Sequence, residues 1–306
     1  EPKNVVLDEQ SDLSRFSEWA NAAKTNQTKV WMQLNHPGKQ IPGYLSKEPV
    51  APSAIPLGKG LEKAFNKPRA LTEPQIIEII EKFATSAQLA KAAGFDGVQI
   101  HGAHGYLVSQ FLSSRHNQRT DRWGGSLENR MRFVLEVYKA IREKTGESFP
   151  VGIKLNSADY MKGGFTPEES MLVIKKLGDA GINLIEISGG TYESPSMVGH
   201  KIKESTKARE AYFLEYAEQA RNLVDTKLVV TGGFRSAKAM NEALQSGATD
   251  MIGLARPLAV CTDVPNKMMK DETYKIHVPT PSTGIRALDK LAMLSITWFE
   301  IQIARI

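Results

Sequence analysis

The chain has 306 residues, of which 41% are hydrophobic and 24% are charged, a balance that excludes a disordered or collagen-like protein. Its 39 basic and 34 acidic residues give a formal net charge of +5, but the two signs are interspersed, which argues against a nucleic-acid partner. The single cysteine, Cys261, excludes an internal disulfide and any zinc or iron–sulfur site built from several thiolates.

The sequence also bears on where the protein resides. No apolar run approaches the roughly 18 residues that span a membrane, and no signal peptide is recognisable. Together with the single cysteine, this favours a cytoplasmic protein without a membrane partner. The chain begins with Glu1 rather than Met, which indicates a processed or cut N-terminus.

Strand-like and helix-like segments alternate along the chain. Short apolar runs rich in β-branched residues predict strands at 30–34, 98–101, 151–155, 184–188, 228–231 and 251–254. Helical spacing, N-cap residues and terminal glycines predict helices at 13–23, from Thr72 to Gly94, from Ser126 to Gly146, from Thr166 to Gly181, at 209–224, from Ser236 to Gln245 and at 285–306.

This order predicts a parallel sheet with helices outside it, either an open doubly wound sheet or a closed barrel. A dinucleotide-binding open sheet carries a Gly-x-Gly-x-x-Gly turn after an early strand, and this chain has none. Polar residues instead lie at the carboxyl ends of the strands, which form the active face of a TIM (β/α)8 barrel. They are Gln33, His101, Lys154, Ser188, Thr231 and Arg256. We therefore predict an α/β protein with a TIM (β/α)8 barrel.

The predicted strands fall short of the eight that such a barrel needs. Gly-rich exits suited to phosphate follow the last two, and barrels often bind phosphate after strands seven and eight. The visible strands, within 30–257, are therefore numbered three to eight, and the first two strands are apparently missing from this chain. We predict one barrel domain over residues 1–306, ending in the helix at about 285–306.

Three groups that could carry chemistry follow the strand at 98–101: His101, His104 and Tyr106. Imidazole N–H groups can donate to a substrate oxygen, and a tyrosine can donate a proton. The alternatives are ordinary polar loop residues, or three metal ligands if His116 joins the two histidines. No nearby Asp or Glu completes a familiar metal spacing, so we predict no metal site.

Two further groups suit a bound cofactor. Gly232 and Gly233 follow one late strand and Arg256 the next, and Gly190 lies after the preceding strand; backbone N–H groups and a guanidinium would hold an anion. Gln33 can donate and accept at the edge of a heterocycle such as a flavin pyrimidine. Lys154 could stabilise negative charge, reach solvent, or form a Schiff base as in an aldolase.

Longer motifs resemble those of the old yellow enzyme family of FMN-dependent NADH:flavin oxidoreductases. The resemblance runs from about residue 30 to residue 257, and its motifs agree in order and position. They are Ala93-Gly94-Phe95-Asp96-Gly97-Val98-Gln99-Ile100-His101-Gly102-Ala103-His104-Gly105-Tyr106-Leu107, Trp123-Gly124-Gly125-Ser126-Leu127-Glu128-Asn129-Arg130, Gln33-Leu34-Asn35-His36-Pro37-Gly38, Ser188-Gly189-Gly190 and Gly232-Gly233-Phe234-Arg235.

The resemblance implies an enzyme that takes hydride from NAD(P)H through FMN and reduces the activated C=C bond of α,β-unsaturated carbonyl compounds. Tyr106 would protonate the substrate Cα, while His101 and His104 would bind its activating oxygen. The cofactor would be held by Gln33 at the flavin pyrimidine, by Lys154 near flavin N1, where many members carry Arg, and at the phosphate by Gly190, Gly232, Gly233 and Arg256.

The expected partner is a small enone-type molecule, and the sequence leaves open whether the chain forms a homo-oligomer. Lys39 replaces an Arg that is common after His-Pro-Gly in the family. Two alternatives stay open beside the ene-reductase: a non-catalytic or truncated barrel paralogue acting as a binding protein, and a Schiff-base aldolase that uses Lys154.

Overall fold

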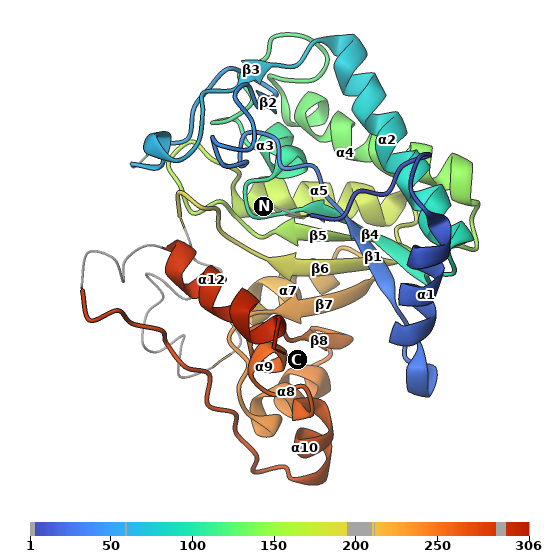
Figure 1. The fold of residues 1–306 in the computed structure, drawn as a ribbon, viewed down its shortest axis with the longest axis vertical. Coiled ribbons are helices and arrows are strands. Elements are labelled where there is room, and N and C mark those ends of the chain that lie inside the picture. The colour runs from blue at the N-terminus through green and yellow to red at the C-terminus, as the bar shows by residue number, and fades with distance from the viewer. Residues whose placement is uncertain (1–3, 59, 195–209, 211, 286–291, 306) are drawn as a thin grey trace.

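The computed structural model describes residues 4–58, 60–194, 210, 212–285 and 292–305 (Figure 1). Its main sheet is parallel throughout, in the order β1-β4-β5-β6-β7-β8. These strands are β1 (Trp31–Leu34), β4 (Gly97–Gly102), β5 (Val151–Asn156), β6 (Leu184–Ser188), β7 (Lys227–Thr231) and β8 (Met251–Gly253). Each strand predicted from sequence is confirmed. Among the described residues no ladder joins β1 to β8, so the sheet curves without closing through these strands.

The two faces of the sheet differ in chemistry because successive residues of a strand point to opposite sides. One face is apolar, and its residues are no more than 1% exposed; they are Val98, Ile100, Ile153, Leu155, Ile185, Ile187, Leu228 and Val230. The other face holds the ring of Trp31, whose atoms would lie 2.6 Å and 2.9 Å from a Cβ at Gly97 and Gly152. The same face carries Gln33 two residues further along β1.

Helices follow the strands as the alternating pattern predicts. They are α1 (Leu13–Ala23), α2 (Glu73–Ala92), α3 (Leu107–Leu112), α4 (Leu127–Thr145), α5 (Pro167–Asp179), α7 (Leu214–Arg221), α8 (Ala237–Gln245), α9 (Arg256–Val260), α10 (Val264–Lys270) and α12 (Ala292–Ile303). Two 3-10 turns, η1 (Thr25–Gln27) and η2 (Leu61–Lys63), and a short ladder of β2 (Val50–Ala51) with β3 (Arg69–Ala70) lie in the early loops.

The predicted helix starts have their expected caps. The hydroxyl of Thr166 accepts from the backbone N–H of Glu169 at 3.2 Å, and the Glu169 carboxylate accepts from the N–H of Thr166 at 3.3 Å. Ser126 and Ser236 cap α4 and α8 in the same way through their hydroxyls. Helix α2 packs on α4 and on β4, and α7 and α8 pack on β7 and β8.

One predicted helix is wrong in extent, and another is described only in part. The helix predicted at 209–224 is shorter, because Glu210 is left-handed with φ of 61° and α7 begins only at Leu214; residues 209 and 211 lie outside the described part. The helix predicted at 285–306 is described only as Ala292–Ile303, and Ile285 is not helical. Residues 286–291 and 306 lie outside the described part. No helix among the described residues is long and apolar enough to cross a membrane.

Candidate active site

Three aromatic side chains converge just beyond the carboxyl end of β4. The ring centroids of His101 and His104 are 5.2 Å apart, and the ring of Tyr106 meets that of His101 edge-on at 4.8 Å. They converge within residues 101–106 because His104 and Gly105 both adopt left-handed conformations, with φ of 60° and 83°. A Cβ at Gly105 would lie only 2.5 Å from Oε1 of Gln40, so the turn is also tightly packed.

Hydrogen bonds and burial define the state of the two imidazoles. Nε2 of His104 lies 2.8 Å from Oγ of Ser188 at the end of β6. Nδ1 of His101 accepts from the backbone N–H of Ala103 at 3.4 Å, which places the proton of the neutral ring on Nε2. Burial lowers the pKa of His101 to about 3 and that of His104 well below its ordinary value. Each ring is therefore neutral near pH 7 and carries one N–H donor.

Buried neutral histidines make the stability of the fold depend on pH. Burial also lowers the pKa of His36 to about 4 and that of His116 to about 3, whereas unfolded histidines titrate near 6.5. The unfolded state thus binds more protons below pH 6.5, and the free energy of unfolding falls as the pH drops from about 6.5 to about 4. Each histidine contributes up to about 1.4 kcal/mol per pH unit. Burial raises the pKa of Asp159, so this group makes the free energy of unfolding rise as the pH drops. It is a single group, however, and four histidines act in the other direction.

Urea unfolding followed by circular dichroism checks this dependence. We expect the urea midpoint to fall steeply between pH 6.5 and pH 4. A midpoint that stays constant or rises over this range would show that these histidines are charged or exposed in the folded state.

A chain of polar contacts crosses the inward face of the sheet and includes Lys154. Its Nζ lies 2.8 Å from Oε1 of Glu186, and both side chains are largely buried. Glu186 also accepts from Oγ1 of Thr231 at 2.5 Å and from Nε2 of Gln99 at 2.8 Å. Burial alone would raise the pKa of Glu186, but the ion pair and these two hydrogen bonds hold it below its usual range. Gln33 joins the chain by donating from Nε2 to Oε1 of Gln99 at 2.7 Å.

A cavity of about 300 Å³ opens at the carboxyl ends of the later strands. This volume lies at the lower end of the range for ligand pockets. Its lining includes several of the predicted site residues: His104, Lys154, Gly232, Gly233 and Arg256. Phe299, Glu300 and Ile303 of α12 complete the wall, because α12 packs against α9. In Figure 1, α12 (red) lies beside α9 at this side of the sheet.

The two arginines of this cavity suit an anionic ligand. Arg235 and Arg256 both line the cavity, and burial lowers the pKa of each. The positive charge of Arg256 lowers the pKa of Arg235 further, so the two guanidiniums lie close enough to repel each other. A bound phosphate would offset that repulsion. The donor set therefore fits the phosphate of FMN.

The turn after β7 needs glycine at position 233 for a structural reason as well as for anion binding. A Cβ on Gly233, whose φ is 94°, would lie 1.5 Å from the carbonyl oxygen of Glu210. The Glu210 carboxylate accepts from the backbone N–H groups of Arg235 and Ser236, each at 2.8 Å. Those two N–H groups are therefore engaged within the protein. The donors that would face an anion are the backbone N–H groups of the Gly232-Gly233 turn and the guanidiniums of Arg235 and Arg256.

Four predicted residues are not part of the lining of this cavity: His101 and Tyr106, which contact each other beside it, and Gln33 and Gly190. Gln33 lines a separate cavity of about 260 Å³ beside β1, and it approaches Lys154 only through Gln99 and Glu186. Gly190, with φ of 91°, donates its N–H to the carbonyl of Ala158 at 3.0 Å. Among the described residues no cluster of His, Cys, Asp or Glu could hold a metal ion.

Sequence reasoning missed three residues of the site. Glu186 is a charged residue inside a buried strand, which was a usable signal, and Gln99 precedes His101 by two positions on the same strand face. Tyr192, whose hydroxyl lies 3.0 Å from that of Tyr106, follows the turn after β6, and nothing in its sequence context marks it.

Parallel strands joined by helices, with a cavity of polar and cationic residues at their carboxyl ends, define a TIM-type β/α-barrel enzyme. Comparison with known proteins specifies the family. A model of the NADH:flavin oxidoreductase / NADH oxidase family matches residues 2–274. The chain belongs to this family.

Individual relatives agree with that assignment. An NADH-dependent flavin oxidoreductase of Hypocrea jecorina is 40% identical over 285 residues, covering 86% of this chain and 70% of the relative. A cinnamate reductase of Clostridium sporogenes is 35% identical over 271 residues, covering 81% of this chain but only 39% of the relative. FMN as cofactor and NAD(P)H as reductant, which the resemblance implied, are confirmed at the level of the family.

Solved structures agree on the fold. A 2-naphthoyl-CoA reductase in complex with 2-naphthoyl-CoA has a TM-score of 0.79 and 28% identity, covering 87% of this chain and 42% of the other. An old yellow enzyme homologue from Zymomonas mobilis has a TM-score of 0.71 and 26% identity, covering 88% of this chain and 75% of the other. These likenesses confirm the old yellow enzyme family and its barrel fold.

Proposed function

We propose that residues 1–306 form one FMN-binding domain that takes hydride from NAD(P)H and reduces the activated C=C bond of α,β-unsaturated carbonyl compounds. The observation that carries this is the convergence of His101, His104 and Tyr106 beside the cavity that Arg256 lines. The relative named for cinnamate supports it, since cinnamate is a conjugated carboxylate.

Most of the residues that would hold the cofactor line the cavity, and Gly190 and Gln33 are added from the family resemblance. Gly232, Gly233 and Arg256 would hold the phosphate, with Gly190 nearby, because the turn approaches closely and the guanidinium supplies charge. Lys154 would stand near flavin N1 and Gln33 at the pyrimidine edge. FMN, when bound, supplies the hydride-transfer chemistry.

The chain's own residues would bind and protonate the substrate. His101 and His104, both neutral, donate N–H groups to the carbonyl oxygen, where negative charge grows as the double bond is reduced. Tyr106 lies against His101 and gives its hydroxyl proton to the substrate Cα. The shared pocket then serves reductant and substrate in turn.

The geometry weighs against the other two functions. A Schiff-base lysine must be unprotonated to attack a carbonyl, whereas Lys154 is ion-paired with Glu186 at 2.8 Å. A binding protein without catalysis would have no need for two neutral imidazoles and a phenol in contact.

Isotope labelling tests the proposal. FMN-loaded protein is incubated without oxygen with cyclohexenone, and separately with cinnamate, using NADH or NADPH deuterated at the transferable position. We expect the saturated product, with deuterium from the reductant at Cβ; in D₂O with ordinary reductant, deuterium appears at Cα. Consumption of reductant only when oxygen is admitted, without any saturated product, would contradict the proposal.

A further inference from the structure

A second phenol contacts the predicted proton donor. The hydroxyl oxygens of Tyr106 and Tyr192 are 3.0 Å apart, and their ring centroids are 6.1 Å apart at an angle of 68°. Tyr106 comes from the turn after β4 and Tyr192 from the turn after β6. The other side of the Tyr192 ring meets Phe65 edge-on, with centroids 6.2 Å apart. Both tyrosines are partly buried.

The turn that carries Tyr192 is closed on itself and tied to the histidine segment. Thr191 and Ser194 exchange two backbone hydrogen bonds, each of 3.0 Å. Thr191 also forms a parallel bridge with His104, so the two turns lie side by side. This arrangement fixes the backbone on either side of Tyr192 relative to the segment that carries Tyr106.

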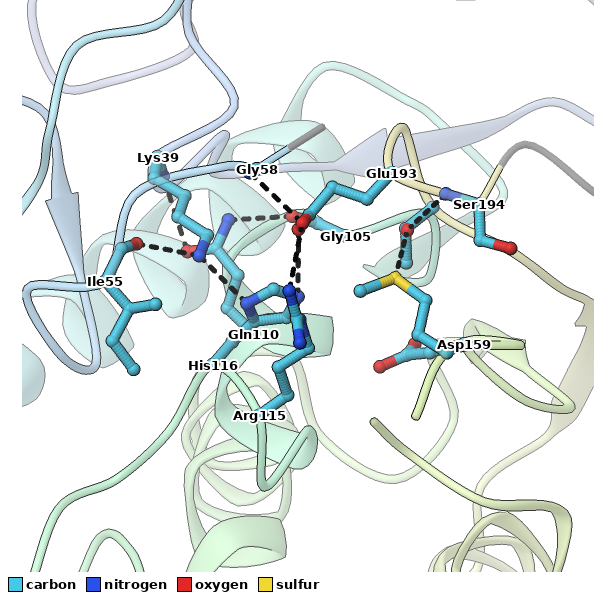
Figure 2. A network of polar contacts seen from close by, with 12 residues as sticks. Lys39, Ile55, Gly58, Gly105, Gln110, Arg115, His116, Asp159, Glu193 and Ser194 are labelled. Carbon is cyan, nitrogen blue, oxygen red and sulfur yellow. Dashed lines mark hydrogen bonds and ion pairs between the residues drawn. The ribbon is translucent and has the colours of Figure 1, made fainter. Parts of the chain in front are cut away.

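The next residue, Glu193, anchors the turn to two other loops (Figure 2). Its side chain is 1% exposed, and its carboxylate faces His116 at 3.4 Å and Arg115 at 3.6 Å. The same carboxylate accepts from the backbone N–H of Gly58 at 3.1 Å. A buried carboxylate held from three sides leaves the turn little freedom to move.

A buried lysine completes this anchor. Nζ of Lys39 lies 2.9 Å from Nδ1 of His116 and donates to the carbonyl of Ile55 at 2.8 Å. Because burial keeps His116 neutral, with its pKa lowered to about 3, its Nδ1 accepts from Lys39, while its Nε2 lies 3.4 Å from Oε2 of Glu193. The residue that departs from the family's usual Arg thus helps to hold the Tyr192 turn.

We propose that Tyr192 is a positioning residue for Tyr106, which orients the Tyr106 hydroxyl and supplies it with a proton as Tyr106 protonates the substrate. This proposal rests on the proposed function and adds a second phenol to it. The observation that carries it is the hydroxyl pair, held by the Glu193 anchor.

The proton balance is simple. The O–H bond of Tyr106 breaks as the substrate Cα–H bond forms, and negative charge appears on the Tyr106 oxygen. The O–H proton of Tyr192 moves to that oxygen, and water then restores the proton of Tyr192. The hydride and its electron pair come from the reduced cofactor, so the alkene gains one hydride and one solvent proton.

Rapid kinetics with the FMN-loaded protein test the relay. Tyr192→Phe removes one oxygen and keeps the ring, and Tyr274→Phe, beyond α10, is the matched control. Tyr192→Phe loses the hydrogen bond from the Tyr192 hydroxyl to the negatively charged Tyr106 oxygen. We therefore expect it to slow flavin reoxidation by cyclohexenone about 10- to 100-fold. Reduction by NADPH keeps its rate, Tyr274→Phe behaves as wild type, and Tyr192→Phe adds no further loss to Tyr106→Phe.

A proton inventory gives a readout that a merely structural role would not move. The reoxidation rate is measured over mixtures of H₂O and D₂O. Two protons in motion predict a curved dependence in the wild type and a straight line in Tyr192→Phe. An unchanged reoxidation rate in Tyr192→Phe, or a straight line in the wild type, would overturn the relay. A wild type that reduces no enone would overturn the proposed function, and the relay with it.

Discussion

Tyr106→Phe slows reduction of an enone by about 10²- to 10⁴-fold, the usual contribution of a positioned general acid, and leaves reduction of the flavin by NADPH unchanged. The reason is that the phenol proton enters only the second half of the cycle, when the substrate Cα is protonated. The substitution keeps the ring that packs edge-on against His101, so substrate binding and the fold are retained. Stopped-flow absorbance separates the two halves.

Two comparisons make this result specific. Tyr274→Phe removes a phenol oxygen beyond α10 and should change neither half. A nitroalkene can be reduced to a stable anion before it is protonated. Tyr106→Phe should therefore slow flavin reoxidation by a nitroalkene much less than reoxidation by cyclohexenone. If Tyr106→Phe reoxidises with cyclohexenone at the wild-type rate, Tyr106 is not the proton donor.

The second large effect concerns the phosphate. We expect Arg256→Ala to weaken FMN binding about 10- to 100-fold, since a charged hydrogen bond to phosphate is worth about 1.5–3 kcal/mol. Arg256 lines the cavity together with Arg235, and a phosphate there would offset the repulsion between the two guanidiniums. Arg256→Lys keeps the charge but loses the two parallel N–H donors of the guanidinium, so its affinity for FMN should lie between those of the wild type and Arg256→Ala.

Riboflavin supplies the control, because it lacks the phosphate. Flavin fluorescence gives the dissociation constant of each ligand from wild type and variants. Arg256→Ala should weaken the binding of FMN and leave the binding of riboflavin nearly unchanged. The Arg15 side chain on α1 is 83% exposed, so Arg15→Ala should affect the binding of neither ligand. Equal losses for FMN and riboflavin would mean that Arg256 supports the cavity wall rather than the phosphate.

The regular part of the fold could be predicted from the sequence because its signals are local. Buried parallel strands read as short apolar runs, and Thr166 and Ser126 mark helix starts by side-chain hydrogen bonds within one turn. Where a distant contact overrides the local pattern, prediction failed. The segment before α7 has a helical pattern, but the Glu210 carboxylate binds the N–H groups of Arg235 and Ser236 and its backbone turns left-handed.

The candidate site divides in the same way. His101, His104 and Tyr106 are close in sequence, so their convergence could be expected from one turn. The contact of Tyr106 with Tyr192 joins residues 86 positions apart, and no local pattern encodes it. The wall that α12 contributes to the cavity is likewise a tertiary contact, visible only once α12 lies on α9.

One absorbance experiment tests the central claim most directly. The FMN-loaded chain is titrated without oxygen with NADPH, and cyclohexenone is added last. The account predicts that the visible flavin bands bleach with NADPH and return when the enone is added, with the saturated ketone formed in equal amount. Bands that bleach but stay bleached in the presence of cyclohexenone and cinnamate would contradict it.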